Sequence, residues 1–187
     1  MADKQLNGIR VAILATDLFE EAELTEPRKA LEQAGAKTVV ISPKEGQIQA
    51  VQHDKKTKKV KVDQKLDEAN AGDFDAVLLP GGAMNADAIR IESKAQEFVR
   101  QIDQAGKPIA VICHGPWLLI SAGLTDGRKM TSYKTIQDDI RNSGAEWTDE
   151  EAVRDRNWVS SRQPSDIPRF NQEMIALFSE NIAQKAA

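Results

Sequence analysis

Two adjacent residues, Cys113 and His114, have the chemistry of a nucleophile and its proton carrier. A thiolate attacks carbonyl carbons, and an imidazole beside it can take up and return protons near neutral pH. The apolar run at 109–112 has the composition of a buried parallel strand, and Pro116 suits the first turn of a helix. A strand-to-helix elbow would expose Cys113 at the carboxyl edge of a sheet, where the helix dipole favours a thiolate. We therefore expect Cys113 to ionise readily and to act as a nucleophile.

A purely structural role is the alternative for both residues. Lone cysteines are often buried core residues, and a histidine in a turn is often only a surface residue. On a regular strand neighbouring side chains face opposite ways, so His114 can assist Cys113 only if the chain turns sharply. The Gly115-Pro116 turn and the helix after it favour the chemical roles.

Acidic residues and a glycine pair are the next candidates. Glu20, Glu21 and Glu23 precede or open a predicted helix, where the dipole alone would favour carboxylates. A carboxyl group held beside the thiolate would have a raised pKa, and in its protonated form it could donate a hydrogen bond to the sulfur. Gly81 and Gly82 form either a structural turn or, with the backbone N–H of His114, an oxyanion hole.

Alternating strand and helix patterns predict the framework for these residues, a three-layer α/β sandwich with a mainly parallel central sheet. In such a sheet the turns after the strands meet at the carboxyl edge, so the acidic turn, the glycine pair and Cys113 should converge there. His53 and the lysine run after it are interpreted as a solvated hairpin tip. The predicted elements are strand 9–15, a helix closed by Gly35, strand 38–41, a polar hairpin at 48–62, strand 76–79, helices 87–91 and 93–105, strand 109–112, strand 128–133, helix 136–142, a polar hairpin at 152–161 and an amphipathic helix at 167–183.

Composition narrows the class of protein. The 187 residues suit one domain spanning 1–187, and 41% hydrophobic with 29% charged residues is ordinary for a soluble protein. A net charge of -4 gives no electrostatic reason to expect nucleic acid or a membrane as partner. No window approaches the roughly 18 apolar residues of a membrane span, and residues 1–8 carry no signal-peptide core, so we expect a cytoplasmic protein. One cysteine and two histidines cannot form a thiolate-rich zinc site, and we expect neither a metal nor a cofactor.

Several motifs resemble the PfpI family of the Parkinsonism-associated deglycase superfamily, which has the class I glutamine amidotransferase-like fold. The resemblance covers nearly the whole chain and keeps the order of the motifs. It is carried by Glu-Glu-Ala-Glu-Leu-Thr-Glu-Pro at 20–27, Leu-Pro-Gly-Gly at 79–82, Ile-Cys-His-Gly-Pro at 112–116, Gly-Arg-Lys-Met-Thr-Ser-Tyr at 127–133, Gly-Ala-Glu-Trp at 144–147 and Asn-Trp-Val-Ser-Ser-Arg at 157–162.

The resemblance implies a single PfpI-like domain with a flavodoxin-like sandwich and a nucleophile elbow. It places the nucleophile at Cys113 and its partner at His114, and it assigns the carboxyl group that contacts the thiol to Glu23. Glu20 would lie near the same pocket. The family forms dimers and often hexamers, in which an acid from the neighbouring subunit completes the triad, and Asp87 is the best local match although one extra residue separates the motifs here.

Two further pocket residues follow from the resemblance. Tyr133 matches a pocket tyrosine, and Trp117 stands where many relatives carry glutamine, so that it would change the pocket wall. The implied activities are conversion of methylglyoxal to lactate without glutathione, removal of early glycation adducts, and intracellular proteolysis, with small carbonyl compounds or glycated and peptide substrates as partners. Small aldehydes are the easier electrophiles, so the first two rank above proteolysis.

Three other classes of function compete. A glutamine amidotransferase domain is nearly excluded, because it needs a distal histidine and none follows His114. A redox sensor or holdase chaperone would use the same Cys113 thiol without turnover. A flavodoxin-like binding module has no support, because no glycine-rich phosphate loop is present.

Overall fold

Strand β1 (Arg10–Leu14) lies inside a seven-stranded central sheet and is hydrogen-bonded to a parallel neighbour on each side. The computed structural model describes the backbone of residues 5–186 and the side chains of residues 5–181. All neighbouring strands of this sheet are parallel except β11 and β12, which pair antiparallel at one edge. In sheet order the strands are β11 (Ala152–Asp155), β12 (Trp158–Ser161), β8 (Ile109–Ile112), β7 (Ala76–Leu79), β1, β3 (Lys37–Ser42) and β6 (Gln64–Lys65).

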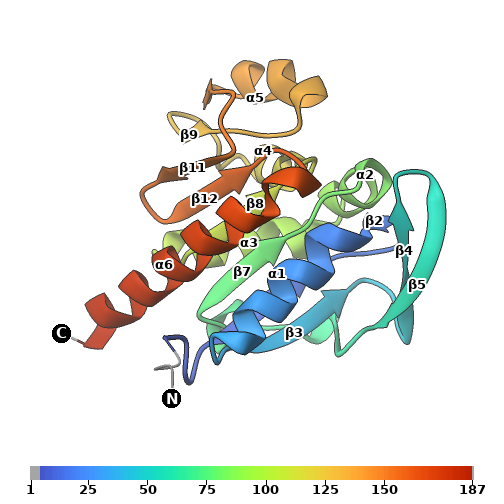
Figure 1. Cartoon of the computed structure of the whole chain (residues 1–187), viewed down its shortest axis with the longest axis horizontal. Coiled ribbons are helices and arrows are strands. Elements are labelled where there is room, and N and C mark those ends of the chain that lie inside the picture. The colour runs from blue at the N-terminus through green and yellow to red at the C-terminus, as the bar shows by residue number, and fades with distance from the viewer. Residues whose placement is uncertain (1–4, 187) are drawn as a thin grey trace.

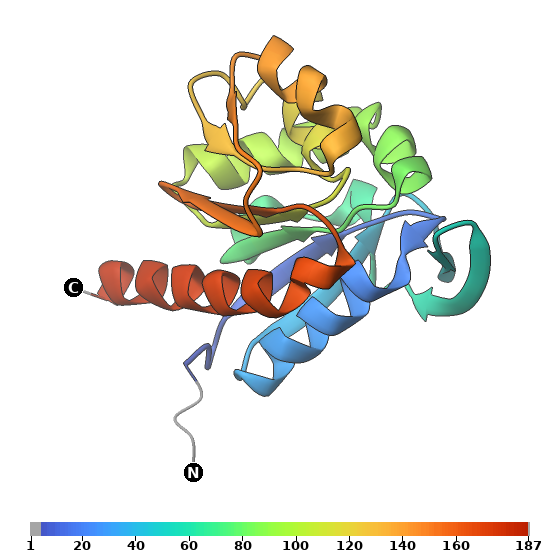
Figure 2. The same ribbon diagram turned by 45° about the horizontal axis from the view of Figure 1, so that its top comes forward.

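Helices cover both faces of the sheet and make the three layers visible in Figure 1. Alternate residues of a strand face opposite sides, so Ile13 packs with α1 (Glu21–Gln33) and α6 (Ile167–Ala186), whereas Leu14 packs on the other face. Figure 2 shows α1 and α6 together on one side of the sheet. The opposite layer contains α2 (Ala83–Arg90), α3 (Ser93–Gln104), α4 (Pro116–Ser121) and α5 (Gln137–Asn142). The predicted three-layer, mainly parallel flavodoxin-like sandwich is therefore confirmed.

A small three-stranded sheet lies beside the main one. The hairpin predicted at 48–62 is present as β4 (Gln47–Gln52) and β5 (Lys55–Lys61). The third strand, β2 (Phe19–Glu20), pairs in parallel with β4, and its two residues are too few to show in a sequence pattern. This pairing fixes the hairpin tip beside the acidic turn that precedes α1.

Two predictions in the C-terminal third need correction. The segment 152–161 forms the predicted hairpin, but its second strand, β12, is fully buried and pairs with β8, so it is a strand of the central sheet and not part of a polar hairpin. Its serines are compatible with burial because their hydroxyls are hydrogen-bonded; Ser160 Oγ, for example, accepts from the backbone N–H of Thr131.

The strand predicted at 128–133 shrinks to β9 (Lys129–Met130), which pairs with β10 (Glu146–Trp147). The remaining short elements are the 3-10 helices η1 (Leu66–Glu68), η2 (Ala71–Asp73), η3 (Lys134–Ile136) and η4 (Pro164–Asp166). Within the described part of the chain, no helix combines the length and apolar character needed to cross a bilayer.

Candidate active site

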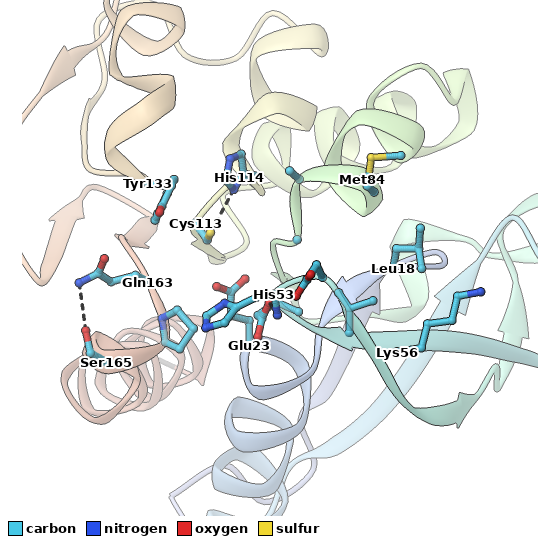
Figure 3. A pocket seen from close by; sticks show the side chains of 16 residues that line it. Leu18, Glu23, His53, Lys56, Met84, Cys113, His114, Tyr133, Gln163 and Ser165 are labelled. Carbon is cyan, nitrogen blue, oxygen red and sulfur yellow. Dashed lines mark hydrogen bonds between the residues drawn. The ribbon is translucent and has the colours of Figure 1, made fainter.

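The turns that follow β1, β7 and β8 converge on one cavity at the carboxyl ends of these strands. The cavity has a volume of about 790 Å³, and Figure 3 shows Cys113, His114, Glu23 and Tyr133 around it. The position is the one expected for ligand sites in parallel α/β sheets. It is lined by Leu18, Glu20, Glu23, Val51, His53, Asp54, Lys56, Gly82, Ala83, Met84, Cys113, His114, Tyr133, Gln163, Pro164 and Ser165.

Cys113 occupies a sharp elbow between β8 and α4. Its φ of 63° lies in the left-handed region, which non-glycine residues seldom adopt. The backbone holds this turn from both sides, because the N–H of Cys113 donates to the Ser161 carbonyl at 3.1 Å and its carbonyl accepts from the N–H of Tyr133 at 2.9 Å. Gly115 is required next, since a Cβ there would lie 2.7 Å from the Leu79 carbonyl oxygen.

His114 lies against the thiol of Cys113, because the elbow turns both side chains to the same side. The distance between Sγ and Nδ1 is 3.1 Å. Burial lowers the pKa of His114, which keeps the imidazole neutral and able to accept a proton. The ring packs between Tyr133 and Trp117, with centroid distances of 5.0 and 5.3 Å.

Glu23 approaches Cys113 from the first turn of α1. Its side chain has no exposed surface, and Oε2 accepts a hydrogen bond from the backbone N–H of Gly81 at 2.8 Å. The other oxygen, Oε1, is buried without a hydrogen-bond partner among the described residues. Burial raises the pKa of Glu23 to about 8, so the carboxyl group is protonated at neutral pH. A protonated Oε1 can donate to a sulfur anion.

The expectation that Cys113 ionises readily is wrong for this resting cavity. The thiol is only 7% exposed, and this burial raises the pKa of the Cys113 thiol. The backbone N–H groups of Gly82 and His114 face the sulfur and act in the opposite direction. Burial outweighs these two N–H groups, because moving an anion out of water is costly. The dipole of α4 adds little to offset this cost, since the helix has only six residues.

Glu20 and His53 form a second polar pair in the cavity. Oε2 of Glu20, which is almost fully buried, accepts a hydrogen bond of 3.0 Å from the backbone N–H of His53. His53 itself lines the cavity at the tip of the β4–β5 hairpin (Figure 3). It is exposed, as expected for a solvated loop residue, but its position at the cavity was not anticipated. No local sequence signal identifies it, because the hairpin reaches the cavity only through the pairing of β4 with the two-residue strand β2.

Backbone strain is concentrated around this cavity. Among the described residues, four that are not glycine have a positive φ, and three of them, Leu18, His53 and Cys113, line it. They come from three separate segments, so no single turn explains the concentration. Left-handed backbone is costly for residues with a Cβ and is retained mainly where function requires it.

The glycine pair has two different roles in the structure. Gly82 has a φ of 84° and lies within the cavity wall, with its N–H toward the Cys113 sulfur. The N–H of Gly81 is already bonded to Glu23, so Gly81 positions that carboxyl group rather than forming part of an oxyanion hole. This corrects the expectation for Gly81.

Two other predicted residues lie outside the cavity wall. Trp117 is half-buried behind His114, and its Nε1 donates to Asp139 at 2.8 Å, so it supports the imidazole and does not line the pocket. Asp87 is exposed on α2 and does not line the cavity formed by this single chain. Sequence reasoning missed Gln163, Pro164 and Ser165, which close the cavity from η4.

Among the described residues, no cluster of three or more His, Cys, Asp or Glu side chains could hold a metal ion.

The fold and the site define a cysteine-centred α/β protein, and comparison identifies its family. Residues 9–177 match the model of the DJ-1/PfpI family, and the chain belongs to this family. It is 43% identical over 169 residues to Deglycase PfpI of Pyrococcus furiosus, covering 90% of this chain and 99% of that protein. It is 41% identical over 174 residues to General stress protein 18 of Bacillus subtilis, covering 92% and 99%. The crystal structure of Drosophila melanogaster DJ-1beta superposes with a TM-score of 0.82 at 25% identity, covering 94% of each chain.

Proposed function

We propose that this protein is a cysteine-dependent enzyme acting on reactive carbonyl compounds in a stress response. Its reactions would be conversion of methylglyoxal to lactate without glutathione, removal of early glycation adducts, or both. The single observation that carries the proposal is the contact of 3.1 Å between Cys113 Sγ and a neutral His114 imidazole in a cavity that also holds Glu23. The deglycase name of the Pyrococcus furiosus relative supports the same chemistry.

The first step forms a hemithioacetal. The Cys113 sulfur adds to the aldehyde carbon of methylglyoxal, the thiol proton passes to His114 Nδ1, and the C=O π electrons move to oxygen, which takes up a proton. Glu23, protonated at neutral pH, stabilises sulfur while it carries negative charge. The backbone N–H groups of Gly82 and His114, which face the sulfur, are the donors available to the developing charge.

The next steps transfer a proton within the adduct. His114 removes the proton from C1 and returns one to C2, so that C1 is oxidised to a thioester while the ketone at C2 is reduced to an alcohol. Water then cleaves the S–C bond, releasing lactate and restoring the thiol. The sum is methylglyoxal plus water to lactate, with no outside oxidant or reductant. From a glycated amine the same thioester is reached after the C–N bond breaks and the amine leaves with a proton.

Proteolysis and redox sensing rank lower for physical reasons. A cavity of about 790 Å³ accommodates a small molecule or a few residues of an extended chain but no folded protein. Sensor cysteines are exposed and have a low pKa, whereas this thiol is 7% exposed and its pKa is raised by burial.

The test is turnover joined to intact-protein mass spectrometry, with the wild type beside Cys113→Ala. We expect methylglyoxal to be consumed and lactate released by the wild type alone, and a sulfur-linked adduct to form with methylglyoxal or a glycated peptide. Equal rates for the two proteins would refute the proposal. Full stress protection by the wild type without any turnover would favour the sensor.

We propose further that the active form is a homodimer or homohexamer in which Asp87 of one subunit contributes to the cavity of the next. Met84 in helix α2 (62% exposed) and Ile91, the residue directly after this helix (77% exposed), are exposed apolar side chains near Asp87 in the sequence. Met84 also lines the cavity, so this apolar surface extends from the site onto the outside of the chain.

A further inference from the structure

A second, smaller cavity continues from the proposed active site. It has a volume of about 350 Å³ and shares Leu18 and Lys56 with the cavity that holds Cys113. It is lined by Asp17, Leu18, Lys44, Gln47, Gln49, Lys56 and Lys59. We call it the lysine cavity. Figure 3 shows Lys56 beside Leu18, on the side of the pocket away from Gln163 and Ser165.

Strand register places Lys56 on the wall of both cavities. Glu20 of β2 is paired with Val51 of β4, and Val51 is paired with Lys56 of β5. Directly paired residues share one face of a sheet, and all three line the active-site cavity. Two strand spacings separate the backbones of Glu20 and Lys56, roughly 10 Å.

An irregularity in the hairpin brings a second lysine to the same face. The register shifts between Gln49 and Val51, so that Gln49 is paired with Lys59 although Val51 is paired with Lys56. Lys56 and Lys59, three residues apart, therefore lie on one face, where strict alternation would separate them. Lys58 lies between them and instead pairs with Glu21 at 3.0 Å.

The lysine cavity carries an excess of positive charge. Lys44 forms an ion pair with Asp17, the one carboxylate in its lining. Within the described part of the chain, Lys56 and Lys59 have no carboxylate within the 4.0 Å of an ion pair, whereas Lys58 and Lys65 have one each. In a chain of net charge -4, this cavity is a local site of attraction for anions.

We propose that the lysine cavity binds an anionic group of the substrate, a phosphate or a carboxylate, while the carbonyl end of the same molecule reacts at Cys113. The inference rests on the proposed function for its carbonyl end and assigns the substrate class: small 2-oxoaldehydes that carry a negative charge a few bonds from the aldehyde. Lys56 and Lys59 supply the charge, and Gln49 lies on the same face as a neutral polar neighbour. Both lysines are exposed, so the attraction is moderate and sensitive to salt.

The kinetic experiment compares matched charged and neutral substrates. One pair is 4,5-dioxopentanoate and its methyl ester, and the other is hydroxypyruvaldehyde phosphate and hydroxypyruvaldehyde. We expect the wild type to prefer the charged member of at least one pair by about tenfold in kcat/KM at low ionic strength, and the pair that shows the preference identifies carboxylate or phosphate. Lys56→Gln and Lys59→Gln should each reduce kcat/KM for the charged member about threefold, and Lys59→Gln, which lies outside the cavity that holds Cys113, should leave the neutral member unchanged.

Lys58→Gln is the matched control, since it removes the same charge from the same strand on the side facing Glu21. It should leave the preference unchanged. No preference in either pair, or the same loss in all three variants, would overturn the inference.

A binding measurement separates this inference from the proposed function. Inorganic phosphate, titrated calorimetrically at low ionic strength, should bind the wild type and Lys58→Gln, and its affinity should fall about tenfold in the Lys56→Gln/Lys59→Gln double variant. Such binding without turnover of any aldehyde would refute the proposed function and support the anion site. Turnover of the neutral aldehydes, with phosphate affinity unchanged in the double variant, would support the proposed function and refute the anion site.

Discussion

The backbone N–H of Gly81 donates a hydrogen bond of 2.8 Å to Oε2 of Glu23, across a sequence separation of 58 residues. This bond occupies Oε2 and leaves Oε1, which has no hydrogen-bond partner among the described residues, as the oxygen available to hold a proton. The glycine pair after β7 thus orients the acid that α1 supplies. Activity should therefore depend on the loop that contains Gly81 as much as on the carboxyl group of Glu23.

Substitution of Gly81 by alanine should abolish turnover. A Cβ at this position would lie 2.4 Å from Glu23 Oε2 and 2.7 Å from Cys113 Cβ, so the acid and the nucleophile would be pushed apart. We expect a loss of activity of at least a hundredfold and a destabilisation of about 1–3 kcal/mol, measured by kinetics and urea unfolding. Gly106→Ala is the control: its new Cβ meets nothing within 4 Å, so only backbone strain acts and activity should be retained. An active Gly81→Ala variant would contradict this account.

Glu23 should make the protein less stable as pH rises. Its pKa is about 8 in the folded chain and about 4.3 in an unfolded chain, so between these values the native state binds more protons than the unfolded state. The stabilisation is complete below about pH 4 and is lost progressively up to about pH 8, a change on the order of a few kcal/mol. Urea unfolding at pH 5 and pH 8 should show this fall in the wild type and a smaller one in Glu23→Gln. If the free energy of unfolding depended on pH identically in the two proteins, the Glu23 carboxyl group would have to be solvated in the folded chain.

The framework and the catalytic elbow were predictable because their signals are local. A four-residue apolar strand followed by Gly115 and Pro116 allows few other conformations, and alternating elements leave little choice of sheet. The protonation state of Cys113 was not predictable, because a pKa depends on burial and on Glu23, which is 90 residues away in the chain. For the same reason His53 was missed, since its position depends on a strand of two residues.

The Cys113 thiol should react slowly with iodoacetamide at neutral pH. Burial raises the pKa of the thiol, and the small exposed area limits access by the reagent. We expect an alkylation rate at pH 7 at least tenfold below that of an unstructured cysteine peptide, rising steadily beyond pH 9. Urea-unfolded protein supplies the control for reagent and thiol content. Rapid labelling, with an inflection below pH 7 in the plot of alkylation rate against pH, would show that the thiol ionises readily after all.

His53 should tolerate asparagine better than valine. Asparagine adopts the left-handed backbone of His53, at φ 59°, more readily than the β-branched valine does, whereas both variants keep the backbone N–H that bonds to Glu20. We expect His53→Asn to unfold like the wild type and His53→Val to lose about 1–2 kcal/mol. Because the imidazole forms part of the cavity wall, both variants should raise KM for methylglyoxal. A KM unchanged in His53→Asn would show that the imidazole makes no contact with the substrate.

Asp87 can be tested by mixing two inactive proteins. If Asp87 acts on the cavity of a neighbouring subunit, Asp87→Asn and Cys113→Ala should each be inactive alone, because one lacks the acid and the other lacks the nucleophile. In a mixed oligomer, a subunit with intact Cys113 can lie beside one with intact Asp87, and a dissociated and reassembled equal mixture should regain up to about a quarter of wild-type activity if the oligomer is a dimer. The double variant Cys113→Ala/Asp87→Asn mixed with wild type is the control for dilution. Absence of recovery, with mixed oligomers demonstrated by native mass spectrometry, would restrict Asp87 to its own subunit, where it is exposed and is not part of the cavity lining.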